Sequence, residues 1–368
     1  MTQVDEYFMA EALREARKGL YSTHPNPRVG CVIARDGTVV ARGYHAYAGG
    51  PHAEIEALNA LPEGNARGTS VYVTLEPCAH QGRTPPCAEA LVRARPQRVV
   101  VAIQDPNPQV AGRGIERLRA AGIEVTVGVL ESEARRLNAG FIKRMEQGLP
   151  WLRIKMAMSL DGRTALKNGL SQWITGPDAR RDVQFLRARS SAVLSTARTV
   201  IDDDAALTVR LDAEALGQQI PPRQPLRVIL DARAELTGSE RLFEQSGDLL
   251  LVYAEDQTPT EALRERVRIL PLPVDAEGRF DLRLLMQALA DREINEVHSE
   301  CGKTLAGALL RAGLADELQL YLAPSLLGDA ARGAFDLGEI RIMSDHLSLD
   351  ILEMRVIGQD IRITAQPN

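Results

Sequence analysis

The alternation of apolar and polar residues divides the first part of the chain into short helices and strands. Residues 4–18 place apolar side chains at the spacing of one helix face. Strands are predicted at residues 38–45, 69–75, 98–105 and 123–130. Helices are predicted between them at residues 52–61, 87–94 and 114–122. Strands that alternate with helices indicate an α/β layer structure.

A break in the pattern follows near residue 148. Residues 131–148 predict one polar helix that ends at Gly148, and Pro150 follows two residues later. Glycine and then proline is typical of a helix end. We therefore predict two domains, residues 1–147 and residues 148–368.

The second part of the chain starts the alternation again. Strands are predicted at residues 151–159, 191–197, 225–232, 248–254, 266–272, 294–300 and 317–327. Helices are predicted at residues 178–190 and 304–313, and residues 349–366 predict a closing hairpin. A second α/β domain is expected.

Composition narrows the class of protein. The 368 residues are 45% hydrophobic and 25% charged, as in ordinary globular proteins. The net charge of -5 and the pI near 5.8 give no electrostatic case for nucleic acid. The N-terminus is acidic and amphipathic, and no apolar run is long enough for a membrane span. We expect a cytoplasmic protein with a small-molecule substrate, and local arginine clusters suit a phosphorylated one.

The four cysteines do not form a disulfide scaffold in a chain of this length. Cys31 lies in the apolar run VGCVIA and is predicted to be a core residue, and Cys301 stands alone. Cys78 and Cys87 lie close together among prolines and polar residues. In a reducing compartment, such a pair indicates a metal site.

His52, Glu54, Cys78 and Cys87 together predict a catalytic zinc site. One imidazole and two thiolates are three zinc ligands, and a catalytic zinc keeps its fourth position for water. Zinc deaminases use the metal to make hydroxide and a nearby unliganded glutamate to move the proton. His80 is an alternative fourth ligand, which would make the site closed and structural.

These residues give the first part of the chain a resemblance to the cytidine-deaminase superfamily. Eight residues, AHQGRTPP, separate the cysteines in place of the two in the common P-C-x-x-C form. With HPNPRVGCVIARDG and QDPNPQVAGRG, this insertion resembles the bifunctional riboflavin-biosynthesis deaminase–reductases. The resemblance implies a three-layer deaminase fold and a pyrimidine substrate carrying a phosphoribosylamino group. It suggests that Asn26 contacts the ring and that His80 and Arg83 contact the phosphate.

No dinucleotide-binding glycine fingerprint occurs in the second part of the chain. Gly302-Lys303-Thr304 resembles the end of a P-loop, but Val297 stands where its first glycine is required. Without the P-loop, the segment is still predicted to be a strand followed by a glycine turn and the start of a helix. That geometry binds phosphate through backbone N–H groups.

MAMSLDGRTA, SQWITG and STARTVIDDDAALTVR resemble the reductase half of the same family, which has a dihydrofolate-reductase-like fold. The resemblance implies NADPH reduction of the opened ribosyl group to ribityl. The positions implied for the cofactor are Ala157, Trp173, Thr199, Asp203, Gly302, Lys303, Thr304, Leu305, Ala306, Gly307 and Ala308. Those implied for the substrate are Ser171, Arg187, Leu207, Arg210 and Glu300. The chain departs from the family at two positions. The family usually has proline at the position of Asp204, and it usually has proline or glycine at the position of Lys303.

The residue types agree with part of this assignment. Arg187 and Arg210 are suited to clamp a phosphate, although arginines on a helix are commonly only solvated. Glu300 ends a predicted strand, where ligands bind in open sheets. Trp173 is suited to stack on a flat ring or to fill a core.

The prediction is a bifunctional enzyme that uses Zn²⁺ and NADPH and forms a homo-oligomer, with a dimer as the first expectation. One alternative is a nucleoside or nucleic-acid deaminase with a non-catalytic second domain, which the acidic pI opposes. Another is a structural zinc protein that binds nucleotides without chemistry. That alternative requires a filled fourth position on the metal.

Overall fold

The chain forms two compact units in a computed structural model that describes residues 2–79, 86–108 and 110–368. One unit comprises the chain up to Gly148 together with Gly217–Gln219, and the other comprises Leu149–Leu216 and Ile220–Asn368. No helix in these described ranges has the length and apolar character needed to cross a membrane.

The first unit is built on a five-stranded sheet in the order β2-β1-β3-β4-β5. β1 pairs antiparallel with β2 and β3, and β3, β4 and β5 run parallel. The strands are β1 Gly30–Arg35, β2 Thr38–Tyr44, β3 Ser70–Val73, β4 Arg98–Val101 and β5 Glu124–Val127.

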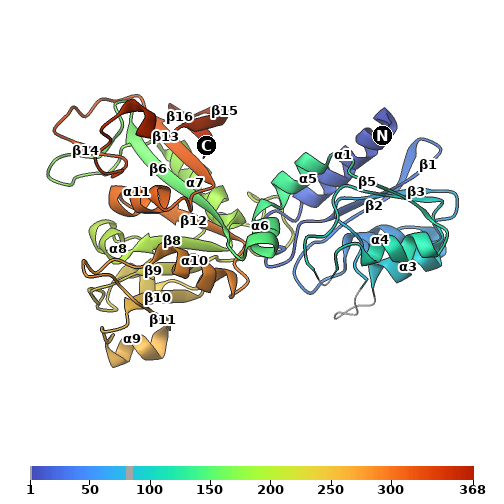
Figure 1. The fold of residues 1–368 in the computed structure, drawn as a ribbon, viewed down its shortest axis with the longest axis horizontal. Helices are drawn as coiled ribbons and strands as arrows, with labels where there is room; N and C mark the ends of the chain where they lie inside the picture. The colour runs from blue at the N-terminus through green and yellow to red at the C-terminus, as the bar shows by residue number, and fades with distance from the viewer. Residues whose placement is uncertain (1, 80–85, 109) are drawn as a thin grey trace. The chain divides into compact units, whose positions relative to one another are not determined.

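Helices cover both faces of this sheet, so the first unit has three layers (Figure 1). One core joins the sheet to α2 Ala53–Asn59, α3 Cys87–Ala94 and α4 Arg113–Ala120. The other joins it to α1 Gln3–Arg17, α5 Glu131–Leu137 and α6 Ala139–Gln147. Cys31 is fully buried in the first of these cores, as predicted.

The helix predicted over residues 131–148 is two helices, α5 and α6, which meet at Asn138. The side chain of Asn138 explains the break. Its Oδ1 accepts from the backbone N–H of Arg28 at 2.8 Å, and its Nδ2 donates to the Arg28 carbonyl at 2.9 Å. Because this partner lies 110 residues away in the sequence, helical periodicity could not reveal it.

The second unit is built on a nine-stranded sheet in the order β11-β10-β9-β8-β12-β6-β13-β16-β15. The first seven strands in this order, from β11 across to β13, run parallel to one another. β16 and β15 form a hairpin that joins the sheet antiparallel to β13. The strands of this sheet are β6 Trp151–Ser159, β8 Ala192–Thr196, β9 Leu226–Leu230, β10 Leu249–Ala254, β11 Arg268–Leu272, β12 Glu296–Glu300, β13 Glu317–Ala323, β15 Leu349–Ile357 and β16 Asp360–Pro367.

One face of this sheet packs an apolar core against α10 Leu282–Ala290 and α11 Lys303–Arg311. Against the other face pack α7 Pro177–Arg189, α8 Ala197–Asp203 and α9 Glu261–Arg266. The remaining short elements are β7 Arg163–Ala165, β14 Arg332–Gly333, η1 Pro62–Gly64, η2 Arg241–Glu244 and η3 Met343–Asp345.

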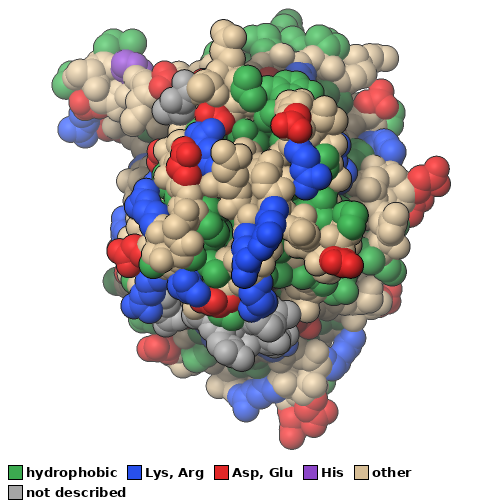
Figure 2. Space-filling view, turned by 90° about the vertical axis from the view of Figure 1, so that its right-hand side faces the viewer, with side chains coloured by type: hydrophobic (Ala, Val, Ile, Leu, Met, Phe, Trp, Pro, Cys, Tyr) green, Lys and Arg blue, Asp and Glu red, His purple; other side chains and the backbone are tan. Residues whose placement is uncertain are grey.

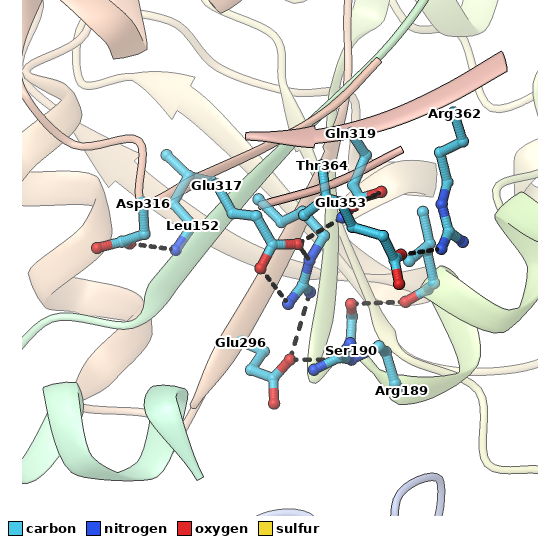
Figure 3. Close-up of polar contacts among 12 residues, drawn as sticks. Leu152, Arg189, Ser190, Glu296, Asp316, Glu317, Gln319, Glu353, Arg362 and Thr364 are labelled. Atoms are coloured by element: carbon cyan, nitrogen blue, oxygen red, sulfur yellow. Dashed lines mark hydrogen bonds and ion pairs between the residues drawn. The ribbon is translucent and has the colours of Figure 1, made fainter. Parts of the chain in front are cut away.

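A buried ionic network lies on the central strands of the second unit (Figure 3). Arg153 on β6 is 1% exposed and donates to Glu317 on β13 at 2.5 Å and to Glu296 on β12 at 3.3 Å. Arg189 of α7 lies 3.5 Å from Glu296. Every charge in the network has a partner of opposite sign, which a buried charge requires.

Candidate active sites

Three predicted metal ligands meet in the first unit. His52 precedes α2, Cys87 begins α3, and Cys78 lies in the loop after β3. Nδ1 of His52 lies 3.2 Å from Sγ of Cys87 and 3.6 Å from Sγ of Cys78. The three ligand atoms all lie within 4.8 Å of one another.

The chemistry of this donor set fits zinc. A hydrogen bond from Cys87 lowers the pKa of Cys78 to about 4, and the same pairing raises the pKa of Cys87. A divalent cation lets both thiols ionise, because it removes the repulsion between two neighbouring thiolates. Within the described ranges the cluster has three ligands, the number typical of a catalytic zinc site.

Glu54 lies in the first turn of α2, two residues after His52, and is 3% exposed. Burial raises the pKa of Glu54 to about 7, against the opposing charge of His52. A hydrogen bond joins its side chain to Cys87. The carboxyl group therefore lies beside the ligand cluster, shielded from bulk water.

Glu76 also positions this site, and the sequence analysis missed it. Its buried carboxylate accepts backbone hydrogen bonds from Gly114 at 2.8 Å and Gly112 at 2.9 Å. It also accepts from Asp105 and Ile115 at 3.1 and 3.2 Å. The residue two positions before Cys78 is thus tied to the start of α4. A Cβ at Gly114 would lie 1.9 Å from the Pro77 carbonyl, so this packing requires glycine.

Asn26 is held near the cluster through His45. The side-chain Nδ2 of Asn26 lies 3.0 Å from Nε2 of His45, and Nδ1 of His45 lies 2.8 Å from the Pro51 carbonyl. The rings of His45 and His52 are 5.5 Å apart. The predicted substrate residues His80 and Arg83 lie outside the described residues.

The second predicted site lies where the strand order of the large sheet reverses. β12 lies between β8 and β6, and all three run parallel, so their carboxyl ends are neighbours. Ala157 lies near the end of β6, Thr199 follows β8 in α8, and Glu300 ends β12. Such a point is where ligands bind in open α/β sheets.

Arg187 and Glu300 form an ion pair at this point. Nε of Arg187 donates to Oε1 of Glu300, and Nη2 donates to Oε2 at 3.0 Å. Nη1 donates to the Thr208 carbonyl at 2.9 Å. Burial opposes ionisation of Glu300, but the charge of Arg187 outweighs it and holds this pKa well below its usual value. The structure thus differs from the predicted phosphate clamp, because Glu300 occupies the bidentate face of Arg187.

Lys155 is a second residue that the sequence analysis missed. It lies directly opposite Glu300 in the pairing of β6 with β12. Burial lowers the pKa of Lys155, although the charges of Glu300 and Asp203 oppose this shift. A lysine inside an apolar-looking strand was a detectable signal, because the MAMSLDG motif follows it at once.

The segment Leu207–Arg210 is fixed by side chains from other elements. Gln224 accepts from the backbone N–H of Val209 at 2.9 Å and donates to its carbonyl at 3.0 Å. Gln184 accepts from the backbone N–H of Arg210 at 3.0 Å. The side chain of Leu207 is buried, whereas Arg210 is exposed. Of the two predicted substrate residues, only Arg210 offers its side chain to a ligand.

Asp203 contacts the segment that carries the predicted residues Ser171 and Trp173. Its carboxylate accepts hydrogen bonds from the side chains of Gln172 and Ser171. Trp173 is 70% exposed, and the guanidinium of Arg180 lies 4.6 Å from its ring centre. Trp173 is therefore not a core residue, and its ring is accessible for stacking.

The turn before α11, where the cofactor contacts are predicted, lies at the surface. Gly302 precedes the nine-residue helix, and nothing lies within 4 Å of the place where its Cβ would stand. Lys303 and Thr304 are exposed, and Leu305 and Ala308 are half-buried. Ala306 and Gly307 are buried, and a Cβ on Gly307 would lie 1.9 Å from the Asp336 carbonyl. Gly307 therefore packs against the backbone of Asp336, and its contact with the cofactor stays a prediction.

Family models match both parts of the chain. The model for the cytidine and deoxycytidylate deaminase zinc-binding region matches residues 2–103, and the model for the RibD C-terminal domain matches residues 150–363. The chain is 50% identical over 362 residues to riboflavin biosynthesis protein RibD of Escherichia coli, covering 97% of this chain and 98% of that one. It is 48% identical over 370 residues to RibD of Haemophilus influenzae, covering 99% and 97%.

Solved structures agree over the whole chain. Acinetobacter baumannii RibD superposes with a TM-score of 0.91 at 44% identity, covering 100% of this chain and 99% of that one. The diaminohydroxyphosphoribosylaminopyrimidine deaminase/5-amino-6-(5-phosphoribosylamino)uracil reductase of Thermotoga maritima superposes with a TM-score of 0.87 at 33% identity. That superposition covers 99% of both chains.

The fold and the sites define a zinc-binding deaminase joined to a reductase in one polypeptide. The chain belongs to the RibD family of riboflavin biosynthesis proteins. It is a bifunctional enzyme, a deaminase that uses zinc and a reductase that uses NADPH. The predictions of α/β architecture, of both activities and of both cofactors are confirmed.

Proposed function

We propose that the enzyme deaminates 2,5-diamino-6-(5-phosphoribosylamino)pyrimidin-4(3H)-one and then reduces the ribosyl group of the product to ribityl. We assign the deaminase to residues 1–147 and the reductase to residues 148–368. The observation that carries the proposal is the cluster of His52, Cys78 and Cys87 with buried Glu54 beside it. The name of the Thermotoga maritima relative supplies the substrate.

In the first reaction, Glu54 moves the proton. When bound by His52, Cys78 and Cys87, zinc acts as a Lewis acid that lowers the pKa of water. Glu54 lies two residues after the ligand His52, in the first turn of α2. Its carboxylate therefore takes the proton of the attacking water and delivers it to the leaving ammonia. Asn26 holds the ring edge, because His45 fixes its amide beside the cluster.

In the second reaction, the opened ribosyl imine is reduced beside charged residues. NADPH, when bound, supplies the hydride that reduces the sugar carbon. The imine nitrogen then needs one proton, and Lys155, whose pKa is lowered by burial, lies opposite Glu300 in the sheet. We assign this proton to Nζ of Lys155. The charge of Glu300, which Arg187 holds, favours the ammonium form of Lys155.

The test is to follow ammonia release and NADPH oxidation together in the wild type and in Glu54→Gln. Each protein receives the aminated pyrimidine and, separately, its deaminated product. Glu54→Gln is expected to release ammonia about 100-fold more slowly or worse, because it loses its proton carrier. It should oxidise NADPH with the deaminated compound at the wild-type rate. A wild type that released no ammonia from the aminated compound would contradict the proposed substrate.

We also propose that the enzyme works in the cytoplasm as a homo-oligomer, with a dimer as the first expectation. All four cysteines are unpaired, which suits a reducing compartment. β15 is the outer strand of the large sheet and exposes Ile351, Met354 and Val356 by 60 to 75%. A long apolar edge strand favours pairing with another chain.

A further inference from the structure

A cavity of about 270 Å³ lies in the second unit at one edge of the large sheet. Its lining includes residues at the start of three neighbouring parallel strands, Arg227 of β9, Leu249 of β10 and Arg268 of β11. Glu300 of the predicted reductase site ends β12, which runs parallel to these strands. The amino and carboxyl ends of parallel strands lie at opposite edges of a sheet, and ligands of the common kind bind at the carboxyl edge. The cavity is therefore separate from the predicted reductase site.

Arg227 gives this cavity a positive charge that is shielded from solvent. Its side chain is 2% exposed, and arginine keeps its proton inside proteins. Nη1 donates to the Leu242 carbonyl at 2.7 Å, and Nη2 donates to the carbonyls of Gly247 at 2.8 Å and Gln245 at 3.2 Å. Nε has no hydrogen-bond partner in the ranges that the structure describes. The guanidinium is thus fixed in position, with one donor unused.

The charge of Arg227 is not neutralised by a contact. Its three acceptors are backbone carbonyls, which carry no formal charge. The carboxylate of Asp248 acts on Arg227 through space and is itself paired with Arg268 at 3.3 Å. A buried charge without a counter-ion is costly, and burial accordingly lowers the pKa of Arg227. The cavity therefore favours a ligand that carries negative charge.

Two exposed arginines line the same cavity. Arg266, at the end of α9, donates to the carbonyls of Gly238 at 3.1 Å and Phe243 at 3.2 Å, and its guanidinium lies 5.6 Å from the Phe243 ring centre. These contacts hold Arg266 beside the loop that surrounds Arg227. With Arg268, the lining has three arginines against the two carboxylates of Asp248 and Glu265, which leaves an excess of one positive charge.

We propose that this cavity binds a phosphate group, either as the free ion or as the monoester of a small molecule, through Arg227, Arg266 and Arg268. Phosphate presents several acceptor oxygens to the planar donors of guanidinium groups, and such charge-assisted contacts are strong. The volume lies just below the range of pockets that hold drug-sized ligands, so the ligand is small. The inference does not rest on the proposed function, because the cavity lies outside both predicted active sites.

The test is calorimetric titration of the full-length, zinc-loaded enzyme, with NADPH bound, at constant ionic strength. One series uses inorganic phosphate and a second uses glycerol phosphate as a simple monoester. Tighter binding of the inorganic ion would identify the free ion as the ligand, and tighter binding of glycerol phosphate would identify a monoester. A wild type that bound neither compound at millimolar concentration would overturn the proposal.

Four variants assign the binding to this cavity. Arg268→Gln should weaken phosphate binding about tenfold, as expected for the loss of one hydrogen-bonded charge. Arg227→Met should abolish the binding, because it removes the buried charge. Asp248→Asn should tighten it, because it removes a negative charge from the lining. Arg283→Gln is the matched control, since Arg283 is an exposed arginine of α10 outside the cavity, and it should bind phosphate as the wild type does.

Arg268 and Asp248 are exposed, so their variants keep the test decisive if Arg227→Met does not fold. The kcat and KM of the reductase should be unchanged in Arg268→Gln, because phosphate bound here does not compete with substrate or NADPH. Phosphate binding of equal strength in the wild type, Arg268→Gln and Asp248→Asn would place the ion elsewhere and overturn the proposal. Because the titration needs no turnover, its result does not depend on the identity of the substrate.

Discussion

A single carboxylate, that of Glu76, joins three segments beside the predicted zinc ligands. Its four backbone partners belong to Asp105, Gly112, Gly114 and Ile115. Hydrogen bonds to a buried carboxylate are stronger than neutral ones, and an unpaired buried donor is costly. The position of Cys78 therefore depends on a residue that contacts no ligand.

Glu76→Gln should weaken this anchor, because an amide has one acceptor oxygen and places an NH₂ group against backbone donors. We expect the first unit to lose about 3 kcal/mol of unfolding free energy and to bind zinc more weakly. Denaturant unfolding, followed at the transition that zinc stabilises, would measure the loss of unfolding free energy. The zinc content after dialysis would measure the weaker zinc binding. Glu116→Gln, at an exposed site in α4, is the control. Equal behaviour of the two variants would refute a positioning role for Glu76.

The zinc-site residues could be predicted because their types, one histidine and two cysteines with a nearby glutamate, identify a metal site. The 26 and 35 residues that separate His52 from Cys78 and Cys87 do not hide this signal. His52 and Glu54 are two residues apart, and Cys87 begins a helix that the sequence predicted at the same bounds. The partners of Glu76 lie 29 to 39 residues away, and Glu300 lies 113 residues from Arg187. Periodicity carries no information about such contacts, so the roles of Glu76, Gln184 and Gln224 could not be predicted. Lys155 differs from them, because a lysine in an apolar strand is visible in the sequence.

At the scale of elements, one ion pair attaches α1 to the sheet of the first unit. Asp5 is 1% exposed, and Arg98 on β4 donates to it at 2.9 and 3.2 Å. Tyr72 of β3 donates to the same carboxylate at 3.2 Å. Burial would raise the pKa of Asp5, but hydrogen bonds from Arg98 and Thr2 and the charge of Arg98 outweigh it, so this pKa is lowered.

The lowered pKa gives the attachment of α1 a pH dependence. A carboxyl group whose folded pKa lies below the ordinary 3.8 stabilises the fold above that value. The stabilisation is lost as the pH falls through the folded pKa. Asp5→Asn should therefore destabilise the first unit by about 2 kcal/mol at pH 7, and by much less once the pH lies below the folded pKa of Asp5.

Thermal unfolding at neutral and acid pH would measure this difference, with Glu6→Gln as an exposed control in the same helix turn. A destabilisation of the same size at both pH values would show that the ion pair does not cause it.

Element types were predicted well, and element ends less well. α3 has its predicted bounds, whereas the helix of residues 131–148 divides at Asn138. α8 and α10 were missed although Thr196 and Asp281 cap their starts, because α8 has only seven residues and α10 only nine, and α8 follows β8 without a break. Tertiary hydrogen bonds at Asn138 outweigh helix propensity there.

At the scale of the whole molecule, the distribution of charged and apolar side chains on the surface bears on how two copies of the chain associate. The face drawn in Figure 2 carries Lys and Arg interspersed with Asp and Glu, rather than a field of one sign. The apolar edge strand β15 is different, because it exposes Met354 by 60% and Val356 by 75%. This edge is where we expect a second copy of the chain to bind.

Replacing both Met354 and Val356 by lysine should convert a wild-type dimer to a monomer, because charge on an edge strand opposes pairing. Light scattering after size-exclusion chromatography would give the mass. Val40→Lys is the control, since Val40 is an apolar residue on the edge strand of the other sheet. A double variant that stayed dimeric would place the interface elsewhere, and a monomeric wild type would remove the proposal.

The most direct test of two separate active sites in one chain is complementation between defective variants. Glu54→Gln lacks the proton carrier of the deaminase, and Lys155→Met lacks the proposed proton donor of the reductase. Neither alone should convert the aminated pyrimidine to the ribityl product with NADPH, although Lys155→Met should still release ammonia. A mixture of the two should restore product formation, because the deaminated intermediate is a substrate for the intact reductase of the other chain. A mixture as inactive as its components, with free intermediate present, would contradict the account.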